Sequence, residues 1–351
     1  MKNKLLFSFV VPTHNSKSTI IPLLDSINNS KLKEFKSFEM IIIDDNSKDN
    51  TFTIVNKNLK KYKFKVSIYS YKKHIGPAKA RNKGAELAQG KFLVFLDGDV
   101  SLQSTTLKNI YELLKSNKIQ AFTGIWDYHQ KTKAFFPQFK ALRDWSYWFS
   151  EKIEDHRYYL FSTRIAGIDR KLFTRLKGFN ESYPEPTVED IEFTYRIEKI
   201  IPIKFASNIV VNHEFEGFKI IAVKYFKRSR DWIKLFTSRR QFDPVATSKR
   251  EAVKPFIIIF IVMSLMFFAL TRLMIFVYLI PLIFVFYLIR EGKFLHMLYQ
   301  KKGFVFMLKS IPVSIVLYLV ILMGAGLGMY EVFRTYIYDV IKQKSAVDST
   351  S

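Results

Sequence analysis

The chain has 351 residues, a formal net charge of +24 and no cysteine. Its length allows one large domain or two smaller ones, each with a sizeable core. The lack of cysteine excludes a disulfide framework and a thiolate metal site, and the positive charge predicts an anionic partner: nucleic acid, a membrane surface or a phosphorylated substrate. Most of this charge precedes the apolar C-terminal third, since residues 1–254 hold 46 basic and 27 acidic residues and residues 255–351 hold nine and four.

The first hundred residues alternate between strand and helix patterns. Strands are predicted at 7–12, 40–43, 66–71 and 92–96, and helices at about 17–29, 51–61 and 78–88. Ser16 or Ser18 is expected to cap the first helix, and Gly90 to end the third in the C′ position. This alternation is typical of an α/β fold with a mostly parallel sheet and helices on both faces.

Polar side chains follow several of the predicted strands, and the clearest example is KFLVFLDGD at 91–99. Open α/β sheets bind ligands at the carboxyl ends of their strands, so these side chains are expected along one rim. Asp97 and Asp99 are hard oxygen ligands of the kind that Mg²⁺ or Mn²⁺ prefers, and Gly98 permits close approach of the backbone. The alternative is an ordinary surface turn, because Asp-Gly is a common turn dipeptide.

Several motifs occur in order along the chain: VVPTHN at 10–15, IIIDDNSKDNT at 41–51, GPAKARNKGAELAQG at 76–90, FLDGD at 95–99, GFNE at 178–181 and VEDIEFTYRI at 188–197. Together they resemble family 2 glycosyltransferases over about residues 5–240. The resemblance implies a catalytic domain of the Rossmann-like GT-A fold over residues 1–215. It also implies a nucleoside-diphosphate sugar as donor and a divalent metal, Mg²⁺ or Mn²⁺, as cofactor.

The resemblance assigns roles to individual residues. The nucleotide-sugar site would comprise Pro12, Thr13, His14, Asn15, Asp44, Asp45, Arg81 and Asp97. The metal would be held by Asp97, Asp99 and His213. His14 departs from the usual pattern, since relatives generally carry Tyr or Phe there. Two alternatives stay open: Asp44 and Asp45 as caps of a helix N-terminus, and His213 as an ordinary hydrogen-bonded histidine.

Glu189 and Asp190 open a helix predicted at 188–200. In an inverting transfer the attacking hydroxyl loses a proton as it displaces the nucleoside diphosphate, and a carboxylate facing the anomeric carbon can accept that proton. Asp190 is predicted as this base, with Glu189 supporting it or binding the acceptor. The alternative is an acidic pair that only stabilises the helix N-terminus. A lipid phosphate acceptor would need no base, and Asp190 would then orient it.

The region between these motifs contains strands predicted at 119–126, 164–169 and 203–211, with a turn at Gly178. The aromatic segment 134–150 fits three interpretations equally: a helix lying on a membrane, a lid on the acceptor site, or ordinary core.

Residues 217–240 contain eight basic residues and one acidic residue among apolar and aromatic ones. Such a segment is compatible with nucleic-acid binding, but the apolar spans that follow favour an anionic membrane surface as partner. Residues 216–254 are therefore predicted as a basic amphipathic interfacial segment. Arg239 and Arg240 are candidate contacts for phosphates of the donor or of a lipid acceptor.

Three uncharged segments, 255–271, 273–289 and 311–330, are long enough to be transmembrane helices, and a polar tail follows at 331–351. The first two would form a tight hairpin that either spans the membrane or re-enters it, so the number of full spans is two or three. By the positive-inside rule, the basic loop predicted at 290–310 lies in the cytoplasm. An even number of crossings separates this loop from the catalytic domain, which is therefore expected in the cytoplasm too. Gly324, Gly326 and Gly328 are expected to allow close helix packing.

These observations predict a multi-pass cell-membrane enzyme: an inverting glycosyltransferase that moves a sugar to a membrane-embedded acceptor, a lipid-linked glycan or a glycolipid. A polyprenyl-phosphate monosaccharide synthase is the alternative from the same class. A catalytically inactive membrane scaffold is disfavoured because both carboxylate sites are retained. A nucleotidyltransferase is disfavoured because its glycine-rich basic N-terminal loop is absent, and no nucleic-acid partner is expected.

Overall fold

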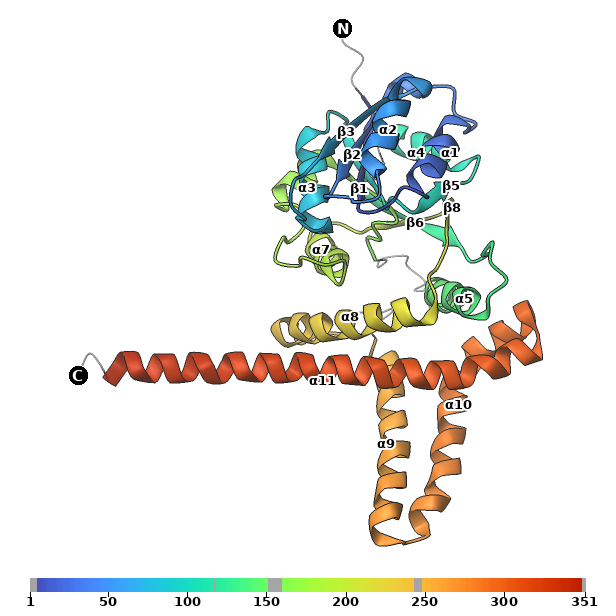
Figure 1. Cartoon of the computed structure of the whole chain (residues 1–351), viewed down its shortest axis with the longest axis vertical. Coiled ribbons are helices and arrows are strands. Elements are labelled where there is room, and N and C mark those ends of the chain that lie inside the picture. The colour runs from blue at the N-terminus through green and yellow to red at the C-terminus, as the bar shows by residue number, and fades with distance from the viewer. Residues whose placement is uncertain (1–4, 117, 151–159, 243–247, 349–351) are drawn as a thin grey trace. The chain divides into compact units, whose positions relative to one another are not determined.

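The computed structural model describes residues 5–116, 118–150, 160–242 and 248–348 (Figure 1). The chain forms two compact units. The first comprises Met1–Ala141 and Lys152–Phe215, and the second comprises Leu142–Glu151 and Glu216–Ser351. The helix α5 (Phe135–Ser150) contributes residues to both.

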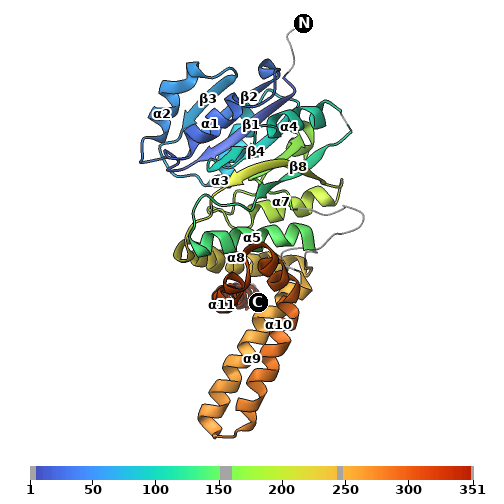
Figure 2. The same cartoon turned by 90° about the vertical axis from the view of Figure 1, so that its right-hand side faces the viewer.

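The first unit is built on an eight-stranded sheet in the order β3-β2-β1-β4-β7-β6-β8-β5 (Figure 2). Its strands are β1 (Phe7–Thr13), β2 (Phe38–Asp44), β3 (Lys65–Ser70), β4 (Phe92–Leu96), β5 (Val100–Leu102), β6 (Ala121–Asp127), β7 (Ile165–Asp169) and β8 (Lys204–His213). Every residue of β2 and β4 is buried. Unbroken burial explains why β4 and residues 40–43 of β2 are continuous apolar runs in the sequence.

Helices connect and cover these strands. They are α1 (Ile20–Asn28), α2 (Thr51–Asn58), α3 (Pro77–Leu87), α4 (Thr106–Lys115), α6 (Arg170–Arg175) and α7 (Glu189–Glu198), with short 3₁₀ turns at Phe35–Ser37 and Leu59–Lys61. The helix α3 packs on β1 and β2, whereas α1 packs on β5 and α4 on β8. The strand and helix positions predicted for the first hundred residues are confirmed.

The prediction of a mostly parallel sheet holds for one part of it. Strands β3, β2, β1 and β4 are parallel to one another, but β7 is antiparallel to both β4 and β6. The strand β5 was not predicted, because three residues directly after Asp99 are too few to give a pattern.

Two local predictions were wrong. No serine side chain caps α1: Thr19 is the N-cap, and the backbone carbonyl of Ser16 accepts the first amide bonds instead. Gly90 does not end α3 in a left-handed conformation. A Cβ atom there would clash with the backbone of Phe7 and Ser8, so glycine is needed because the chain passes close against β1.

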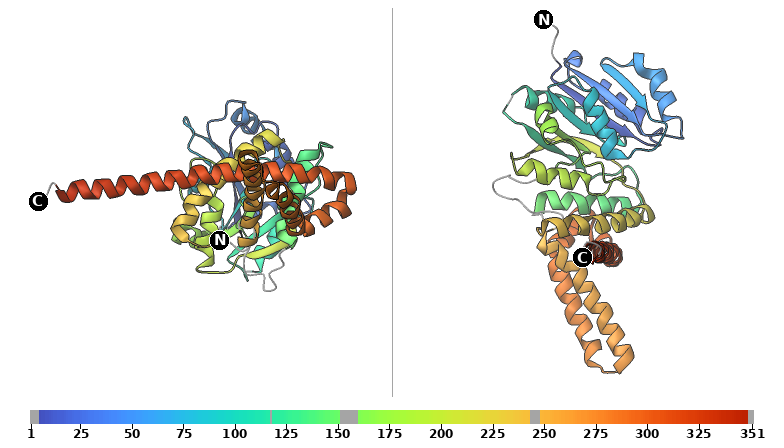
Figure 3. Two further views of the ribbon diagram at one scale, coloured as in Figure 1. Left: turned by 90° about the horizontal axis from the view of Figure 1, so that it is seen from below. Right: turned by 90° about the vertical axis from the view of Figure 1, so that its left-hand side faces the viewer.

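The second unit contains the long helices α8 (Phe218–Arg239), α9 (Lys249–Thr271), α10 (Ile275–Lys302) and α11 (Phe304–Asp348). Three of them, α9, α10 and α11, are long and apolar enough to cross a membrane. The helices α9 and α10 form an antiparallel hairpin (Figure 3). Its turn contains Arg272, which adopts the left-handed conformation at φ 57°.

The helices α8 and α11 lie side by side and cross the axis of the α9–α10 hairpin (Figures 1 and 2). A Cβ atom at Gly324 or Gly328 would clash with the backbone of α8, whereas one at Gly326 would contact nothing. The prediction of close packing is therefore confirmed for two of the three glycines.

The basic segment predicted as a loop at 290–310 is helical over most of its length, because α10 continues to Lys302 and α11 begins at Phe304. The predicted tail is likewise helical as far as Asp348. Residues 243–247 of the predicted interfacial segment and 349–351 of the tail lie outside the described residues.

Candidate active site

The loop after β1 is fastened to the loop after β2. The Asn15 amide donates to Ser47 Oγ at 2.8 Å, and the Lys48 amide donates to Asn15 Oδ1 at 2.7 Å. Asn15 adopts φ 53°, a left-handed conformation that asparagine tolerates. The His14 ring lies with Nδ1 2.6 Å from the Asp45 carbonyl oxygen, and both His14 and Asn15 are exposed. Two predicted nucleotide-site residues are thus presented at the rim on a fixed loop.

Asp44 and Asp45, at the end of β2, are both buried but have different surroundings. Asp45 accepts hydrogen bonds from the amides of Ile75 and Gly76 at 2.6 and 2.9 Å, so its carboxylate holds the loop before α3. Asp44 accepts from Ser70 Oγ at 2.8 Å, while its other carboxylate oxygen is buried without a hydrogen-bond partner among the described residues. Neither residue caps α2, whose first amide bonds to Asp49. Asp45 instead bonds the amides directly before α3.

Arg81 on α3 connects two acidic elements that are far apart in the sequence. Its Nη2 donates to Asp97 Oδ1 at 2.8 Å, and its Nη1 donates to Glu189 Oε1 at 2.9 Å. The guanidinium is buried, and although burial alone would lower its pKa, Asp97 and Glu189 raise it above the usual value. Arg81 is therefore a permanent cation that joins the end of β4 to the start of α7.

Glu189 and Asp190 differ in exposure. Glu189 is buried, its Oε2 has no hydrogen-bond partner among the described residues, and desolvation followed by repulsion from Asp190 raises its pKa against the opposing effect of Arg81. Asp190 is half-buried, with its Oδ1 accepting from the Ile191 amide at 2.9 Å. Asp190 is the more accessible of the two.

Asp99 faces His213 across the edge of the sheet. Val100 of β5 is paired with His213 of β8, and this register brings His213 Nε2 to 3.5 Å from Asp99 Oδ2. The His213 ring is buried against Phe215, with ring centroids 4.5 Å apart, and its Nδ1 has no hydrogen-bond partner among the described residues. Gly98 brings the turn against β1, since a Cβ there would lie 3.0 Å from Thr13 Cγ2.

The donors around Asp99 fit a metal that shares its coordination with a substrate. Within the described ranges, no three histidine or acidic side chains lie close enough to hold a metal ion by themselves. Asp99 and His213 supply an oxygen and a nitrogen donor. Mg²⁺ is commonly held by one or two protein ligands together with substrate phosphates, so this set suits a metal that binds with a diphosphate.

The predicted site residues of the first unit gather in three groups. Pro12, Thr13, His14, Asn15, Asp44 and Asp45 lie around the β1 and β2 ends. Arg81 joins Asp97 to Glu189, which Asp190 follows in α7, and Asp99 lies beside His213. Arg239 and Arg240 end α8 in the second unit, and their predicted phosphate contacts stay a prediction.

The sequence reasoning missed His74. Its Nδ1 lies 2.9 Å from Asp45 Oδ2, and its ring centroid is 4.8 Å from that of His14. The available signal was its position in the polar loop that follows β3, which reaches the same rim as the loops after β1 and β2.

Residues 8–176 match the family model described as Glycosyl transferase family 2. This part of the chain is a family 2 glycosyltransferase domain. The resemblance found in the motifs is thereby confirmed for the domain, as is the GT-A class of its fold.

Curated relatives match about a third of the chain. The poly(ribitol-phosphate) beta-N-acetylglucosaminyltransferase TarS of Staphylococcus aureus is 38% identical over 103 residues, which are 29% of this chain and 18% of that protein. The cholesterol galactosyltransferase of Borreliella burgdorferi is 34% identical over 115 residues, 33% of this chain and 31% of that protein. The chain thus spans less than a third of the length of these relatives.

A solved structure resembles nearly the whole chain. It is the mannosyltransferase PcManGT from Pyrobaculum calidifontis in complex with GDP-Man and Mn²⁺. The TM-score is 0.55 at 14% identity, over 93% of this chain and 87% of that one. At this identity the likeness concerns the fold alone.

Proposed function

We propose that the protein is a membrane-bound inverting glycosyltransferase that moves a sugar from a nucleoside-diphosphate sugar to a membrane-embedded acceptor, a lipid-linked glycan or a glycolipid. The observation that carries the proposal is the double ion pair of Arg81, which ties the Asp97-Gly98-Asp99 turn to the Glu189-Asp190 helix start. Arg81 is thereby bonded both to the turn proposed to bind the donor and to the helix start proposed to carry the base, within one family 2 domain.

In this proposal Asp190 accepts the proton of the acceptor hydroxyl as its oxygen attacks the anomeric carbon. The bond from that carbon to the nucleoside diphosphate breaks, and the diphosphate leaves with the electron pair. Glu189 holds Arg81 in place, because it is buried and bonded to the guanidinium. The accessibility of Asp190 favours it as the base over the buried Glu189.

The nucleoside would bind over the loop 12–15, with the exposed His14 ring available for stacking and the unpartnered oxygen of Asp44 available to a polar group of the base. Asp97, fixed by Arg81, would face the sugar diphosphate. Asp99 and His213 would hold Mg²⁺ or Mn²⁺, which when bound supplies positive charge to the leaving diphosphate. The Mn²⁺ named with the mannosyltransferase structure supports this choice of cofactor.

A membrane acceptor is supported by the three apolar helices and by the many basic residues of α8. The relative from Borreliella burgdorferi is named for a membrane lipid acceptor, cholesterol. An acceptor hydroxyl, rather than a lipid phosphate, agrees with the base role proposed for Asp190, because a lipid phosphate would need no base.

We further propose that the chain makes two full membrane crossings, through α9 and α10. If this hairpin spans the bilayer, α11 crosses its axis and lies along the membrane surface beside the basic α8 (Figure 1). The first unit, which precedes α8, would then be cytoplasmic, in agreement with the soluble supply of nucleotide sugars.

The proposal is tested with Asp99→Asn in the purified full chain. We expect release of nucleoside diphosphate from a panel of sugar nucleotides to depend on Mg²⁺ or Mn²⁺, and to fall at least a hundredfold in this variant. The half-buried Asp25→Asn on α1, away from the site, is a matched control and should behave as the unmodified protein. Undiminished turnover in Asp99→Asn would contradict the assignment of the metal site.

A further inference from the structure

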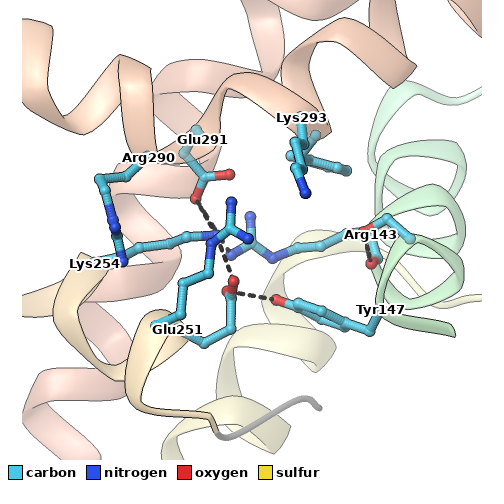
Figure 4. A pocket seen from close by; sticks show the side chains of 10 residues that line it. Arg143, Tyr147, Glu251, Lys254, Arg290, Glu291 and Lys293 are labelled. Atoms are coloured by element: carbon cyan, nitrogen blue, oxygen red, sulfur yellow. Dashed lines mark hydrogen bonds and ion pairs between the residues drawn. The ribbon is translucent and has the colours of Figure 1, made fainter. Parts of the chain in front are cut away.

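The second unit contains a small cavity with many charged side chains. Its volume is about 30 Å³, and it lies among residues of α5, α9 and α10 (Figure 4). Its basic residues are Arg143, Arg250, Lys254, Arg290 and Lys293, and its acidic residues are Glu251 and Glu291. None of these residues takes part in the site proposed for sugar transfer.

The innermost charges of this cavity neutralise one another. Lys254 Nζ lies 2.6 Å from Glu251 Oε1 and 3.5 Å from Glu291 Oε1. Arg143 Nη2 lies 4.0 Å from Glu291 Oε1, and its guanidinium also donates to Ser314 Oγ at 3.1 Å. Two buried cations, Arg143 and Lys254, are therefore matched by the buried Glu291 and the half-buried Glu251, and such pairing is what a low-dielectric environment requires.

Three cations remain in excess at the cavity. Within the described part of the chain, Arg250, Arg290 and Lys293 form no ion pair, and the Nε of Arg290 is buried without a hydrogen-bond partner. A buried N–H donor without an acceptor carries a free-energy cost, which a bound anion would remove. The cavity thus combines net positive charge with an unsatisfied donor.

The position of the cavity along the hairpin indicates where such an anion would come from. Lys254 immediately precedes the apolar stretch 255–271 of α9, and Arg290 immediately follows the stretch 273–289 of α10. Because the two helices are antiparallel, both residues lie at the same end of the hairpin, where apolar sequence gives way to charged sequence. In a helix pair that crosses a bilayer, this level corresponds to the lipid headgroups.

We propose that this cavity binds the phosphate group of a membrane lipid. Its volume admits roughly two water molecules, and so a compact anionic group but neither a sugar nor a nucleotide. Arginine suits this role because its planar guanidinium donates two parallel hydrogen bonds to phosphate oxygens. The site belongs to the second unit, and the proposal stands whether or not the first unit transfers sugar.

The test uses the full chain in a neutral detergent and native mass spectrometry to measure the retention of added lipids. Dioleoyl phosphatidic acid is compared with dioleoyl phosphatidylcholine, and inorganic phosphate is added as a competitor in a third arm. The variant Arg250→Gln/Arg290→Gln removes two of the excess cations. The exposed Lys302→Gln on α10 is the control for general surface charge. Lys293→Gln, also exposed, serves as a milder second variant.

We expect the phosphatidic acid complex of the double variant to be at least tenfold weaker, with a smaller loss in Lys293→Gln and none in Lys302→Gln. Equal retention of both lipids, or an equal loss in Lys302→Gln, would overturn the proposal. Displacement of the lipid by inorganic phosphate at a similar concentration would overturn the assignment to a lipid. Sugar-nucleotide binding measured on the same samples should not change, which separates this test from that of the proposed transfer activity.

Discussion

At the scale of single residues, Arg81 has the largest structural role in the site. Replacing it with Gln leaves Asp97 and the buried Glu189 without their shared cation. Removing one partner of a buried pair typically costs about 3–5 kcal/mol. We therefore expect Arg81→Gln to lower the free energy of unfolding by about this amount in denaturant titrations, and to abolish transfer.

Arg81→Lys keeps the charge and tests the geometry separately. A lysine ammonium is a point charge and cannot reproduce the fork that bonds two carboxylates at once. We expect a smaller loss of stability than in Arg81→Gln but at least a tenfold loss of transfer. Lys83→Gln, half-buried on the same helix and outside the site, should change neither. Full activity of Arg81→Lys would show that net charge alone suffices.

The buried Glu189 predicts a pH dependence of stability. Its pKa is raised above the ordinary value of 4.5, so the folded protein binds this proton more tightly than the unfolded chain does. The stabilising contribution is complete below pH 4.5 and is lost as the pH rises through the folded-state pKa. The unmodified protein should thus lose stability relative to Glu189→Gln as the pH rises from about 4.5. If the stability of the unmodified protein relative to Glu189→Gln stayed constant or grew as the pH rises, a raised pKa of Glu189 would be contradicted.

The identities of most candidate residues could be predicted from the sequence, but their partners could not. Asp45 illustrates the limit: its position after a strand predicted a place at the rim, yet its carboxylate bonds the amides of Ile75 and Gly76. Those bonds join positions 30 and 31 residues away, and no local pattern encodes such a contact. His74 was missed for the same reason.

At the scale of elements, Gly324 and Gly328 determine how α11 packs on α8. Leucine at either position would push against the backbone of α8, and such overpacking costs about 1–3 kcal/mol. We expect Gly324→Leu and Gly328→Leu to lower the melting temperature in detergent. Gly326→Leu provides the control, because its Cβ would contact nothing. Equal effects at all three positions would mean that helix propensity, rather than packing, is responsible.

The elements also show which patterns are informative. The parallel strands β1, β2 and β4 were predictable because burial on both faces leaves a continuous apolar run. The antiparallel position of β7 between β4 and β6 could not be predicted from the sequence, because the direction of this strand depends on a long connection that includes α5. The strand β5 matters most for the site, and its register with β8 places His213 beside Asp99.

At the scale of the whole molecule, the proposed arrangement with two membrane crossings predicts the side on which each helix end lies. The chain has no cysteine, so single cysteines can be introduced without background labelling. In sealed vesicles, Leu273→Cys in the hairpin turn should react with a membrane-impermeant maleimide on one side. Lys302→Cys and Thr335→Cys should both react on the opposite side. Labelling of Thr335→Cys on the same side as Leu273→Cys would mean that α11 also spans the bilayer.

The apolar spans were recognisable from composition, but their mutual arrangement was not. Hydropathy indicates that a helix is apolar enough for a membrane, but it does not determine how the helix is oriented relative to its neighbours. The sequence 311–330 therefore predicted a candidate third span, and α11 is long and apolar enough to be one. Its packing on α8 through two glycines was not predictable from hydropathy. Charged residues at the ends of the apolar runs, such as Lys254 and Arg290, were the available signal for the cavity at the hairpin base.

The central claim is that Asp190 accepts the acceptor proton opposite a separately held donor. It is tested most directly by measuring sugar transfer and nucleoside-diphosphate affinity side by side in Asp190→Asn, with extracted membrane lipids as acceptors. We predict that transfer of labelled sugar into the lipid fraction falls at least a hundredfold while nucleotide affinity changes less than about threefold. Transfer at the rate of the unmodified protein would contradict the account.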